Sequence, residues 1–332
     1  MDNHTEQQVS QTVTLHSLRS IAGKERHSVL GTTEFSAEAY LQKKILAINR
    51  FFLENNLNAV VVGVSGGIDS AVTYCLLEKA MFHFSSPIRH VLGVTMPIFG
   101  DGTSGQREAT EKAVELFKAV SYRHGTSSNK SIGWHTVDLT TPYQKIVSQA
   151  WVDTTPWTNG QMASVLRTPV LYYHAAQLQQ IGFRSVVSGT TNMDEGSYIG
   201  FFGKASDAMV DIQPIADLHK SEVFELAKIL GIPQTIIDSE PKGDVWDNRT
   251  DIEMIGAPYW FIELYTEILN QGGIESFLLE NHLELDHVSW EEYTKYATAL
   301  ENAHLKNLHK YQVGMPSHFI DILPRKVAGG WK

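Results

Sequence analysis

The sequence is poor in cysteine, in positive charge and in long apolar runs. Its 332 residues include one cysteine, Cys75, which excludes an intramolecular disulfide and a cysteine-rich metal site. The 27 lysines and arginines are outnumbered by 37 aspartates and glutamates, and the formal net charge is −10. A nucleic-acid partner is therefore disfavoured, because such binding relies on Lys and Arg to neutralise phosphates. No run approaches the roughly 18 apolar residues of a membrane span. We expect a cytoplasmic protein with neither a membrane nor a nucleic-acid partner.

The N-terminal region is polar and lacks the apolar stretch of a secretory signal. We expect residues 1–35 to form either a poorly ordered tail or an arm that folds on a partner subunit. The whole chain, with 42% hydrophobic and 19% charged residues, has the composition of a globular protein with a sizeable core.

Apolar, β-branched runs alternate with amphipathic segments, a pattern typical of βα units around a parallel sheet. The strands are expected at 58–64, 90–96, 134–138 and 184–188, and the helices at 69–82, 104–122, 161–181, 219–230 and through most of the chain from 258. The sequence thus predicts an α/β fold, a Rossmann-like parallel sheet with helices on both faces, over residues 36–265. A helical C-terminal extension, residues 266–332, would pack on it. In such folds the ligand site lies at the carboxyl edge of the sheet.

A glycine-rich turn follows the first predicted strand, where Ser65 to Ser70 read Ser-Gly-Gly-Ile-Asp-Ser. Gly66 and Gly67 would let backbone N–H groups approach phosphate oxygens, and the next helix would present its positive N-terminus. Asp69 cannot bind phosphate directly, but it could hold a Mg²⁺ ion that bridges phosphates. The alternative is a plain strand–helix turn capped by Ser and Asp.

The Ser-Gly-Gly-Ile-Asp-Ser motif is that of the ATP pyrophosphatases, which include NAD, GMP and asparagine synthetases and tRNA thiolases. Within residues 40–265, further blocks resemble the ammonia-dependent NAD synthetases in order and spacing. These blocks are Gly189-Thr-Thr-Asn-Met-Asp-Glu195, Gly200-Phe-Phe-Gly-Lys204, Asp211-Ile-Gln-Pro-Ile-Ala-Asp-Leu-His-Lys220, Pro241-Lys-Gly-Asp244 and Ile255-Gly-Ala-Pro-Tyr259.

The resemblance implies roles for several residues. Asp69 and Glu195 would be the Mg²⁺ ligands, and a catalytic set would lie around the reacting phosphate: Asp69, Lys204, Asp207 and Lys220. Asp207 could orient ammonia or accept its proton. ATP would be bound by Val64, Ser65, Gly66, Gly67, Asp69, Ser70, Met96, Thr190, Lys220 and Lys242. The carboxylate substrate would be bound by Gln161, Arg167, Tyr172, Phe201, Lys204 and Asp211. For Tyr172, packing within its helix is an equally good explanation, and Asp207 could equally be a surface carboxylate.

The substrate half departs from the family pattern. Val165 stands where the family has its first arginine, Gln161 replaces an asparagine, and Gly203 replaces the threonine of GFFTK. Lys242 replaces a Ser or Thr, and one extra residue lies between Glu195 and the Gly-Phe-Phe block. The ATP half is better kept than the acyl-acceptor half, so both NAD synthesis and a different carboxylate substrate fit.

The resemblance implies a homodimeric ligase that uses Mg²⁺, ATP and ammonia to convert nicotinic acid adenine dinucleotide to NAD through an acyl-adenylate. No glutaminase domain is visible, so we expect ammonia to be free or delivered by a partner. Three alternatives remain: the same chemistry on another carboxylate, a non-catalytic nucleotide-binding protein, and a tRNA-modifying enzyme. The last would need catalytic cysteines, and Cys75 stands alone.

Overall fold

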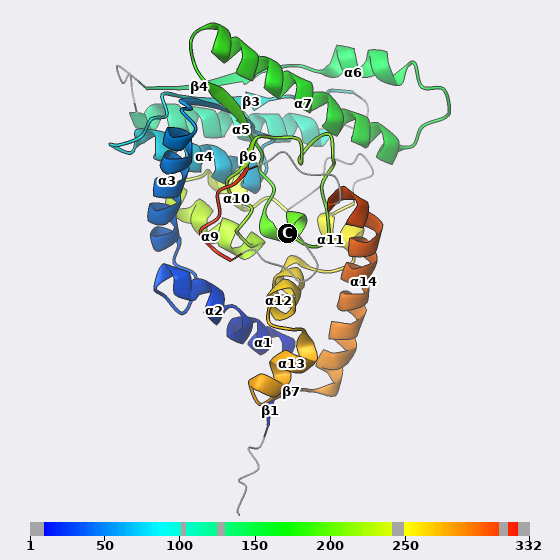
Figure 1. The fold of residues 1–332 in the computed structure, drawn as a ribbon. Coiled ribbons are helices and arrows are strands. Elements are labelled where there is room, and N and C mark those ends of the chain that lie inside the picture. The colour runs from blue at the N-terminus through cyan, green and yellow to red at the C-terminus, as the bar shows by residue number, and fades with distance from the viewer. Residues whose placement is uncertain (1–9, 101–103, 125–129, 241–248, 312–317, 325–332) are drawn as a thin grey trace, which may run out of the picture.

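A six-stranded parallel sheet forms the centre of the molecule (Figure 1). The structure, a computed structural model, describes residues 10–100, 104–124, 130–240, 249–311 and 318–324. The strands are β2 (Ala59–Gly63), β3 (His90–Thr95), β4 (Ser131–Thr136), β5 (Ser185–Ser188), β6 (Ile212–Gln213) and β8 (His318–Phe319). Their order is β4-β3-β2-β5-β6-β8, and every neighbouring pair is parallel. Successive strands are added toward one edge from β2 to β4 and toward the other edge from β5 to β8, so the carboxyl ends of β2 and β5 form the topological switch point.

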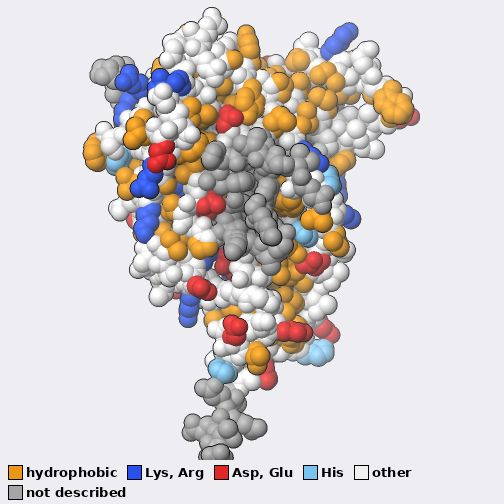
Figure 2. Space-filling view, in the orientation of Figure 1, with side chains coloured by type: hydrophobic (Ala, Val, Ile, Leu, Met, Phe, Trp, Pro, Cys, Tyr) orange, Lys and Arg blue, Asp and Glu red, His pale blue; other side chains and the backbone are white. Residues whose placement is uncertain are grey.

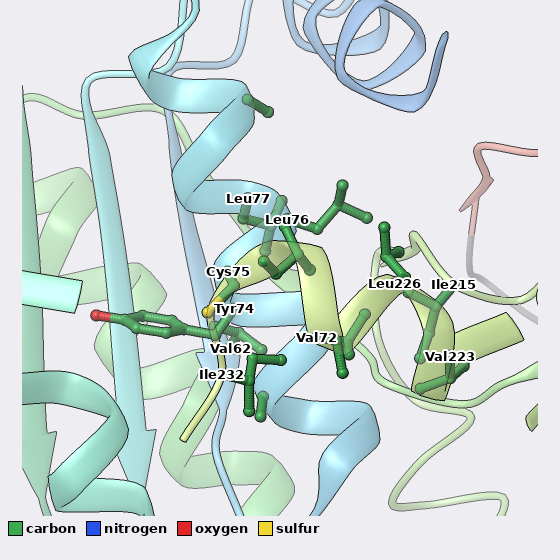
Figure 3. Close-up of a cluster of buried hydrophobic side chains, with 14 of the residues drawn as sticks. Val62, Val72, Tyr74, Cys75, Leu76, Leu77, Ile215, Val223, Leu226 and Ile232 are labelled. Atoms are coloured by element: carbon green, nitrogen blue, oxygen red, sulfur yellow. The ribbon is translucent and has the colours of Figure 1, made fainter. Parts of the chain in front are cut away.

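Helices cover both faces of this sheet. One face carries α3 (Ala37–Glu54), α4 (Ile68–Phe82), α5 (Ser104–His124) and α9 (Lys220–Leu230), and the other carries α6 (Thr140–Val147) and α7 (Pro156–Gln180). Because side chains alternate along a strand, Val60 and Val62 of β2 pack against α4 while Val61 packs toward α7. Figure 3 shows Val62 in one buried cluster with Val72 of α4 and with Val223 and Leu226 of α9. A strand apolar on both faces is what the run at 58–64 predicts.

A second core lies below the sheet and joins the two ends of the chain. Its elements are β1 (Gln11–Val13), α1 (Leu15–Ala22), α12 (Tyr259–Asn270), α13 (Ile274–Glu280), β7 (Leu283–Leu285) and α14 (His287–Tyr311). Strands β1 and β7 pair in parallel, and Leu18 of α1 is fully buried in this core. Short connecting elements complete the fold: α2 (Lys24–His27), a 3-10 turn (Ser28–Leu30), α8 (Met193–Gly196), α10 (Gln234–Ile237) and α11 (Asp251–Ile255).

The predicted α/β architecture is confirmed, and the four predicted strands correspond to β2, β3, β4 and β5. The strand expected at 134–138 lies slightly earlier, at Ser131–Thr136. The helix expected at 161–181 begins earlier, because Thr155 caps it and Pro156 occupies its first turn. Residues 10–35 differ from the expected poorly ordered tail, since they form β1, α1 and α2 and bury Leu15 and Leu18 on their own chain. The predicted boundary at 265 falls inside α12, and β8 gives the C-terminal extension a strand of the main sheet. Among the described helices, none combines the length and apolar character needed to cross a bilayer.

One fully buried ion pair connects three parts of the fold. Lys44 of α3 places its Nζ 2.8 Å from Asp217 Oδ1, and both side chains are inaccessible to solvent. Asp217 also accepts hydrogen bonds from Tyr40 Oη and from the backbone N–H groups of Ile322 and Leu323. This carboxylate therefore joins α3, the segment before α9 and the C-terminal strand region.

We expect Lys44→Met to lower the free energy of unfolding by about 3–5 kcal/mol, because it leaves a buried carboxylate without its counter-ion. Chemical denaturation followed by circular dichroism measures the change. The matched control is Lys43→Met, which removes an exposed ammonium that donates to the Val29 carbonyl at 2.7 Å and should cost under about 1 kcal/mol. Equal losses in the two variants would contradict the structural importance of the buried pair.

Candidate functional site

The turn between β2 and α4 is closed by its own side chains. Ser65 N–H donates to Ser70 Oγ at 3.2 Å, Ser70 Oγ donates to the Gly67 carbonyl at 2.9 Å, and Gly67 N–H donates to Ser65 Oγ at 3.3 Å. Gly66 has φ +92°, and a Cβ there would lie 2.1 Å from the Ala109 carbonyl oxygen of α5. Only glycine fits that position. The turn delivers the N-terminus of α4, with its unpaired N–H groups, to the carboxyl edge of the sheet.

Two carboxylates converge on one ammonium at this edge. Lys220 Nζ lies 2.6 Å from Asp69 Oδ2 and 3.2 Å from Glu195 Oε1. Asp69 lies in the first turn of α4, Glu195 in α8 after β5, and Lys220 at the first position of α9 after β6. The structure thus brings together three of the residues predicted from the sequence, each from a different βα connection.

Hydrogen bonds at the helix N-termini hold these side chains in position. Asn192 caps α8 by accepting a hydrogen bond from Glu195 N–H at 3.1 Å, and its Nδ2 donates to Asp69 Oδ1 at 3.0 Å. Asp194 Oδ2 accepts the backbone N–H of Lys220 at 2.7 Å, while its Oδ1 lies 2.6 Å from His219 Nδ1. An acidic side chain at a helix N-terminus is favoured there by the helix dipole. Asn192 and Asp194 therefore fix the three ionised groups relative to one another.

Burial and neighbouring charges shift the pKa values of Glu195 and Lys220. Burial raises the pKa of Glu195 to about 7; Lys220 opposes the change, and the nearby carboxylates of Asp69 and Asp251 add to it. Burial lowers the pKa of Lys220, but the Asp69 and Glu195 carboxylates outweigh it, so that pKa is raised overall. The ammonium stays charged, whereas Glu195 ionises near neutral pH. Three carboxylates around one ammonium leave an excess of negative charge, which favours a further cation.

Tyr259 and Asp251 belong to the site but were assigned no role from the sequence. Tyr259 Oη lies 2.9 Å from Asp251 Oδ2 and 3.2 Å from Glu195 Oε1, and Lys220 Nζ lies 4.9 Å from the centre of its ring. Tyr259 ends the Ile-Gly-Ala-Pro-Tyr block, and Asn192, which contacts Asp69, lies inside the Gly-Thr-Thr-Asn block. Both residues could therefore have been assigned to the site from these motif blocks. No sequence pattern marks Asp251.

Arg167 and Tyr172, predicted to bind the carboxylate substrate, make contacts within the protein. Arg167 donates from Nε to the Met96 carbonyl at 3.3 Å and from Nη2 to Gln106 Oε1 at 3.4 Å. Burial lowers its pKa to about 10, and Asp207 opposes that change. Tyr172 donates to Asp211 Oδ1 at 3.2 Å. Asp211 Oδ2 accepts the N–H of Val187, so Tyr172 and Asp211 fasten α7 to β5.

The segment after α8 carries the remaining predicted substrate residues. Lys204 is exposed, Phe201 is half-buried against the second core, and Asp207 Oδ2 accepts the Gly203 N–H at 3.2 Å. Lys310 of α14 was given no role in the sequence analysis, yet it donates to the Gly200 and Phe202 carbonyls at 2.8 and 2.6 Å. The last turns of α14 thus hold the backbone of this segment in place.

The other predicted residues have varied surroundings. Val64 and Met96 are buried in the cores on opposite faces of the sheet, Thr190 is half-buried in the loop after β5, and Gln161 is exposed on α7. Lys242 lies outside the described residues. The roles of these residues in binding stay predictions.

Comparison with known proteins places the sequence in a family. The profile of the NAD synthase family matches residues 40–313. An NH(3)-dependent NAD(+) synthetase of Methanocaldococcus jannaschii is 30% identical over 77% of this chain and 90% of its own length. One of Carboxydothermus hydrogenoformans is 34% identical over 64% of this chain and 78% of its own.

Solved structures share the fold. The NMN synthetase of Francisella tularensis superposes with a TM-score of 0.64 at 24% identity, over 85% of this chain and 98% of that one. The NH3-dependent NAD synthetase of Campylobacter jejuni gives a TM-score of 0.57 at 23% identity, over 83% and 96%. Through the family match and the sequence relatives, this chain belongs to the NAD synthase family.

Proposed function

We propose that this chain is an ammonia-dependent NAD synthetase, which converts nicotinic acid adenine dinucleotide to NAD and splits ATP into AMP and pyrophosphate. The observation that carries the proposal is the meeting of Asp69, Glu195 and Lys220 beside the phosphate turn. Membership of the NAD synthase family gives that constellation its chemistry.

The reaction has two balanced steps. A substrate carboxylate oxygen attacks the α-phosphorus of ATP, a bond to the bridging oxygen breaks, and pyrophosphate leaves. Ammonia then attacks the acyl carbon, AMP leaves with the electron pair of the broken C–O bond, and one proton is released. The N-terminus of α4 and the Lys220 ammonium face the charge that develops on the phosphates. Asp207 is proposed to orient ammonia or accept the proton, and Lys204 to contact the substrate.

The residues at the site fit a Mg²⁺ ion. Two carboxylates reach the same ammonium, and burial raises the pKa of Glu195 to about 7, with the nearby carboxylates of Asp69 and Asp251 adding to the rise. A pair of carboxylates suits Mg²⁺, which is commonly held by one or two carboxylates together with substrate phosphates and water. When bound by Asp69 and Glu195, it would neutralise phosphate charge.

Substrate recognition is assigned to α7 and the segment 200–211. Arg167 would pair a phosphate of the dinucleotide, and Gln161, Tyr172, Phe201 and Asp211 would complete the surface. The exposed side chain of Val165, 37% accessible, stands where the family has an arginine. The same chemistry on another carboxylate is therefore an outcome that the substrate test below must distinguish.

We also propose that the protein is a homodimer joined through the outer surface of α6 and α7, and we place it in the cytosol. Large apolar side chains are exposed here, among them Ile146, Trp151, Trp157, Val165 and Tyr173. Figure 2 shows hydrophobic side chains gathered over the upper part of the molecule, where Figure 1 places these helices. Several large apolar side chains exposed on neighbouring elements are typical of an interaction surface.

The protein, incubated with Mg²⁺, ATP, ammonium and nicotinic acid adenine dinucleotide, should form NAD and AMP in equal amounts and none without ammonium. Chromatography of both products measures the outcome. Asp69→Asn should lower turnover by about 100-fold or more, because it removes a charge that acts at the reacting phosphates; Glu54→Gln, an exposed carboxylate of α3, should not.

Each contrary outcome has a definite meaning. ATP cleavage only with another carboxylate, such as nicotinic acid mononucleotide, would replace the proposed substrate. No cleavage with any carboxylate would favour a non-catalytic nucleotide-binding protein. Unchanged turnover in Asp69→Asn would remove the metal assignment.

Mg²⁺-dependent ATP binding should weaken by about tenfold between pH 8 and pH 6. Glu195, with a pKa raised to about 7, gains a proton as the pH falls through that value, and a protonated carboxyl is a poor metal ligand. Calorimetric titrations at the two pH values measure the change. Glu195→Gln should bind weakly at both, and it corrects for the titration of ATP itself. An equal pH dependence in the two proteins would contradict the assignment.

Sedimentation should give a mass twice the 37.1 kDa of one chain. Val165→Glu should weaken association by about 100-fold, because it buries an unpaired charge between subunits. The control, Leu305→Glu, alters an equally apolar side chain exposed on α14 and should leave the mass unchanged. A monomeric wild type would contradict the dimer, and dissociation by Leu305→Glu alone would place the interface elsewhere.

A further inference from the structure

The N-terminal segment, residues 10–30, lies outside the 40–313 range that the family profile matches. It is nevertheless built into the molecule, with Leu15, Leu18 and Ala22 buried against α12 in the second core. Figure 1 shows α1 beside α12, with α2 leading from it toward α3. The segment carries one fully buried charged residue, Arg26, whose side chain is 2% accessible.

Arg26 reaches the elements that carry both halves of the charged site. Its Nη2 lies 2.7 Å from Glu222 Oε2 in the first turn of α9, two residues from Lys220. Its Nη1 donates to Met193 Sδ at 3.2 Å, at the first residue of α8 and two residues from Glu195. One planar guanidinium thus contacts both α8 and the first turn of α9.

The same guanidinium is anchored on its remaining sides. Nη1 donates to the Pro324 carbonyl at 2.9 Å, and Nη2 also donates to the Asp217 carbonyl. Glu267 Oε1 lies 3.7 Å from Nε. The planar guanidinium carries five N–H donors in a fixed geometry, so few orientations can satisfy all of these acceptors. Contacts from four separate parts of the chain therefore fix its position.

The N-terminal segment also holds the two residues that follow Lys220. Glu222 accepts His27 Nε2 at 2.7 Å as well as Arg26, and it accepts the backbone N–H of His219 at 2.8 Å. Arg19 of α1 pairs with Glu263 at 2.6 Å, and Glu263 accepts the hydroxyl of Ser221. The first turn of α9 therefore rests on side chains supplied from residues 19–27.

We propose that Arg26 is a positioning residue of the enzyme, which fixes the separation of Glu195 from Lys220 by tying the start of α8 to the start of α9. This inference rests on the proposed function for its kinetic test. It predicts a loss of turnover that is larger than the loss of stability alone would cause, because small displacements of charged groups at a reacting phosphate are costly.

Three variants of the whole chain separate positioning from simple stability, and a fourth, Arg26→Ala, serves for chemical rescue. Arg26→Met removes the fork, Arg26→Lys keeps the charge with a single donor group, and Leu18→Ala opens a cavity in the same segment without touching the charges. Thermal midpoint, turnover, the KM for the dinucleotide and the affinity for Mg²⁺-ATP are measured for each, at a temperature where all are folded.

We expect turnover to fall by about tenfold or more in Arg26→Met, with Mg²⁺-ATP binding weakened and the KM for the dinucleotide changed by under about twofold. Arg26→Lys should lie between Arg26→Met and the wild type, and Leu18→Ala should keep wild-type turnover despite a lowered midpoint. Guanidinium at millimolar concentration should restore part of the turnover of Arg26→Ala, whereas sodium chloride at equal ionic strength should not.

Turnover that follows the thermal midpoint equally in all variants, Leu18→Ala included, would overturn the proposal. If Arg26→Met and Arg26→Ala do not fold, Arg26→Lys decides, and wild-type turnover in that variant overturns it. An inactive wild type would instead contradict the proposed function. In that case the Mg²⁺-ATP affinities of the same variants still test Arg26, and equal affinities would overturn it.

Discussion

The site depends on one ammonium, that of Lys220, held between the carboxylates of Asp69 and Glu195. These three side chains follow β2, β5 and β6, which are neighbours in the sheet. Only a parallel sheet brings three consecutive strand ends to the same edge, so the interaction requires that β2 and β5 pair in register and that β6 extends the sheet beside them. The turn between β2 and α4, which is proposed to bind phosphate, then lies next to these charges because it leaves the same end of β2. The geometry of the charges is a consequence of the strand order.

Holding these charges in a buried position has a structural cost. Ion pairs removed from water add little to stability, yet this molecule buries several around the site, including His219 between Asp194 and Glu267 and Lys44 on Asp217. Burial lowers the pKa of His219, but the flanking Asp194 carboxylate outweighs it and the pKa is raised overall. Apolar side chains of similar size could fill the same volume. A network of charges can also orient its members, which apolar side chains cannot do, because each hydrogen bond fixes a direction as well as a distance.

The sequence predicts four of the six strands of the sheet because a buried strand is encoded locally. The roles of Glu195 and Lys220 are predicted from motif blocks that resemble those of the family. A strand buried on both faces reads as an apolar run, and a glycine turn before a helix marks a phosphate site. The fold of residues 10–35 could not be predicted in this way. Leu15 and Leu18 are buried by α12, which begins at Tyr259, so the surface that orders them is supplied from a distant part of the chain. Asp251 was missed for the same reason, because its link to Glu195 passes through the side chain of Tyr259.

The nucleotide half and the acyl half of the site differ in how firmly the fold determines them. Asp69, Glu195 and Lys220 are locked to one another and to helix termini, so their arrangement leaves little freedom for a different co-substrate. Gln161 of α7 and Lys204 of the segment 200–211 are exposed. Arg167, Tyr172 and Asp211, also proposed to bind the carboxylate substrate, are instead held by contacts within the protein. Exposed positions can change without loss of the fold, and the departures at Val165 and Gly203 occur on these same two elements. Under the proposed function, exposed side chains such as those of Gln161 and Lys204 would set the choice of carboxylate, which is why nicotinic acid adenine dinucleotide has to be tested directly against other acids.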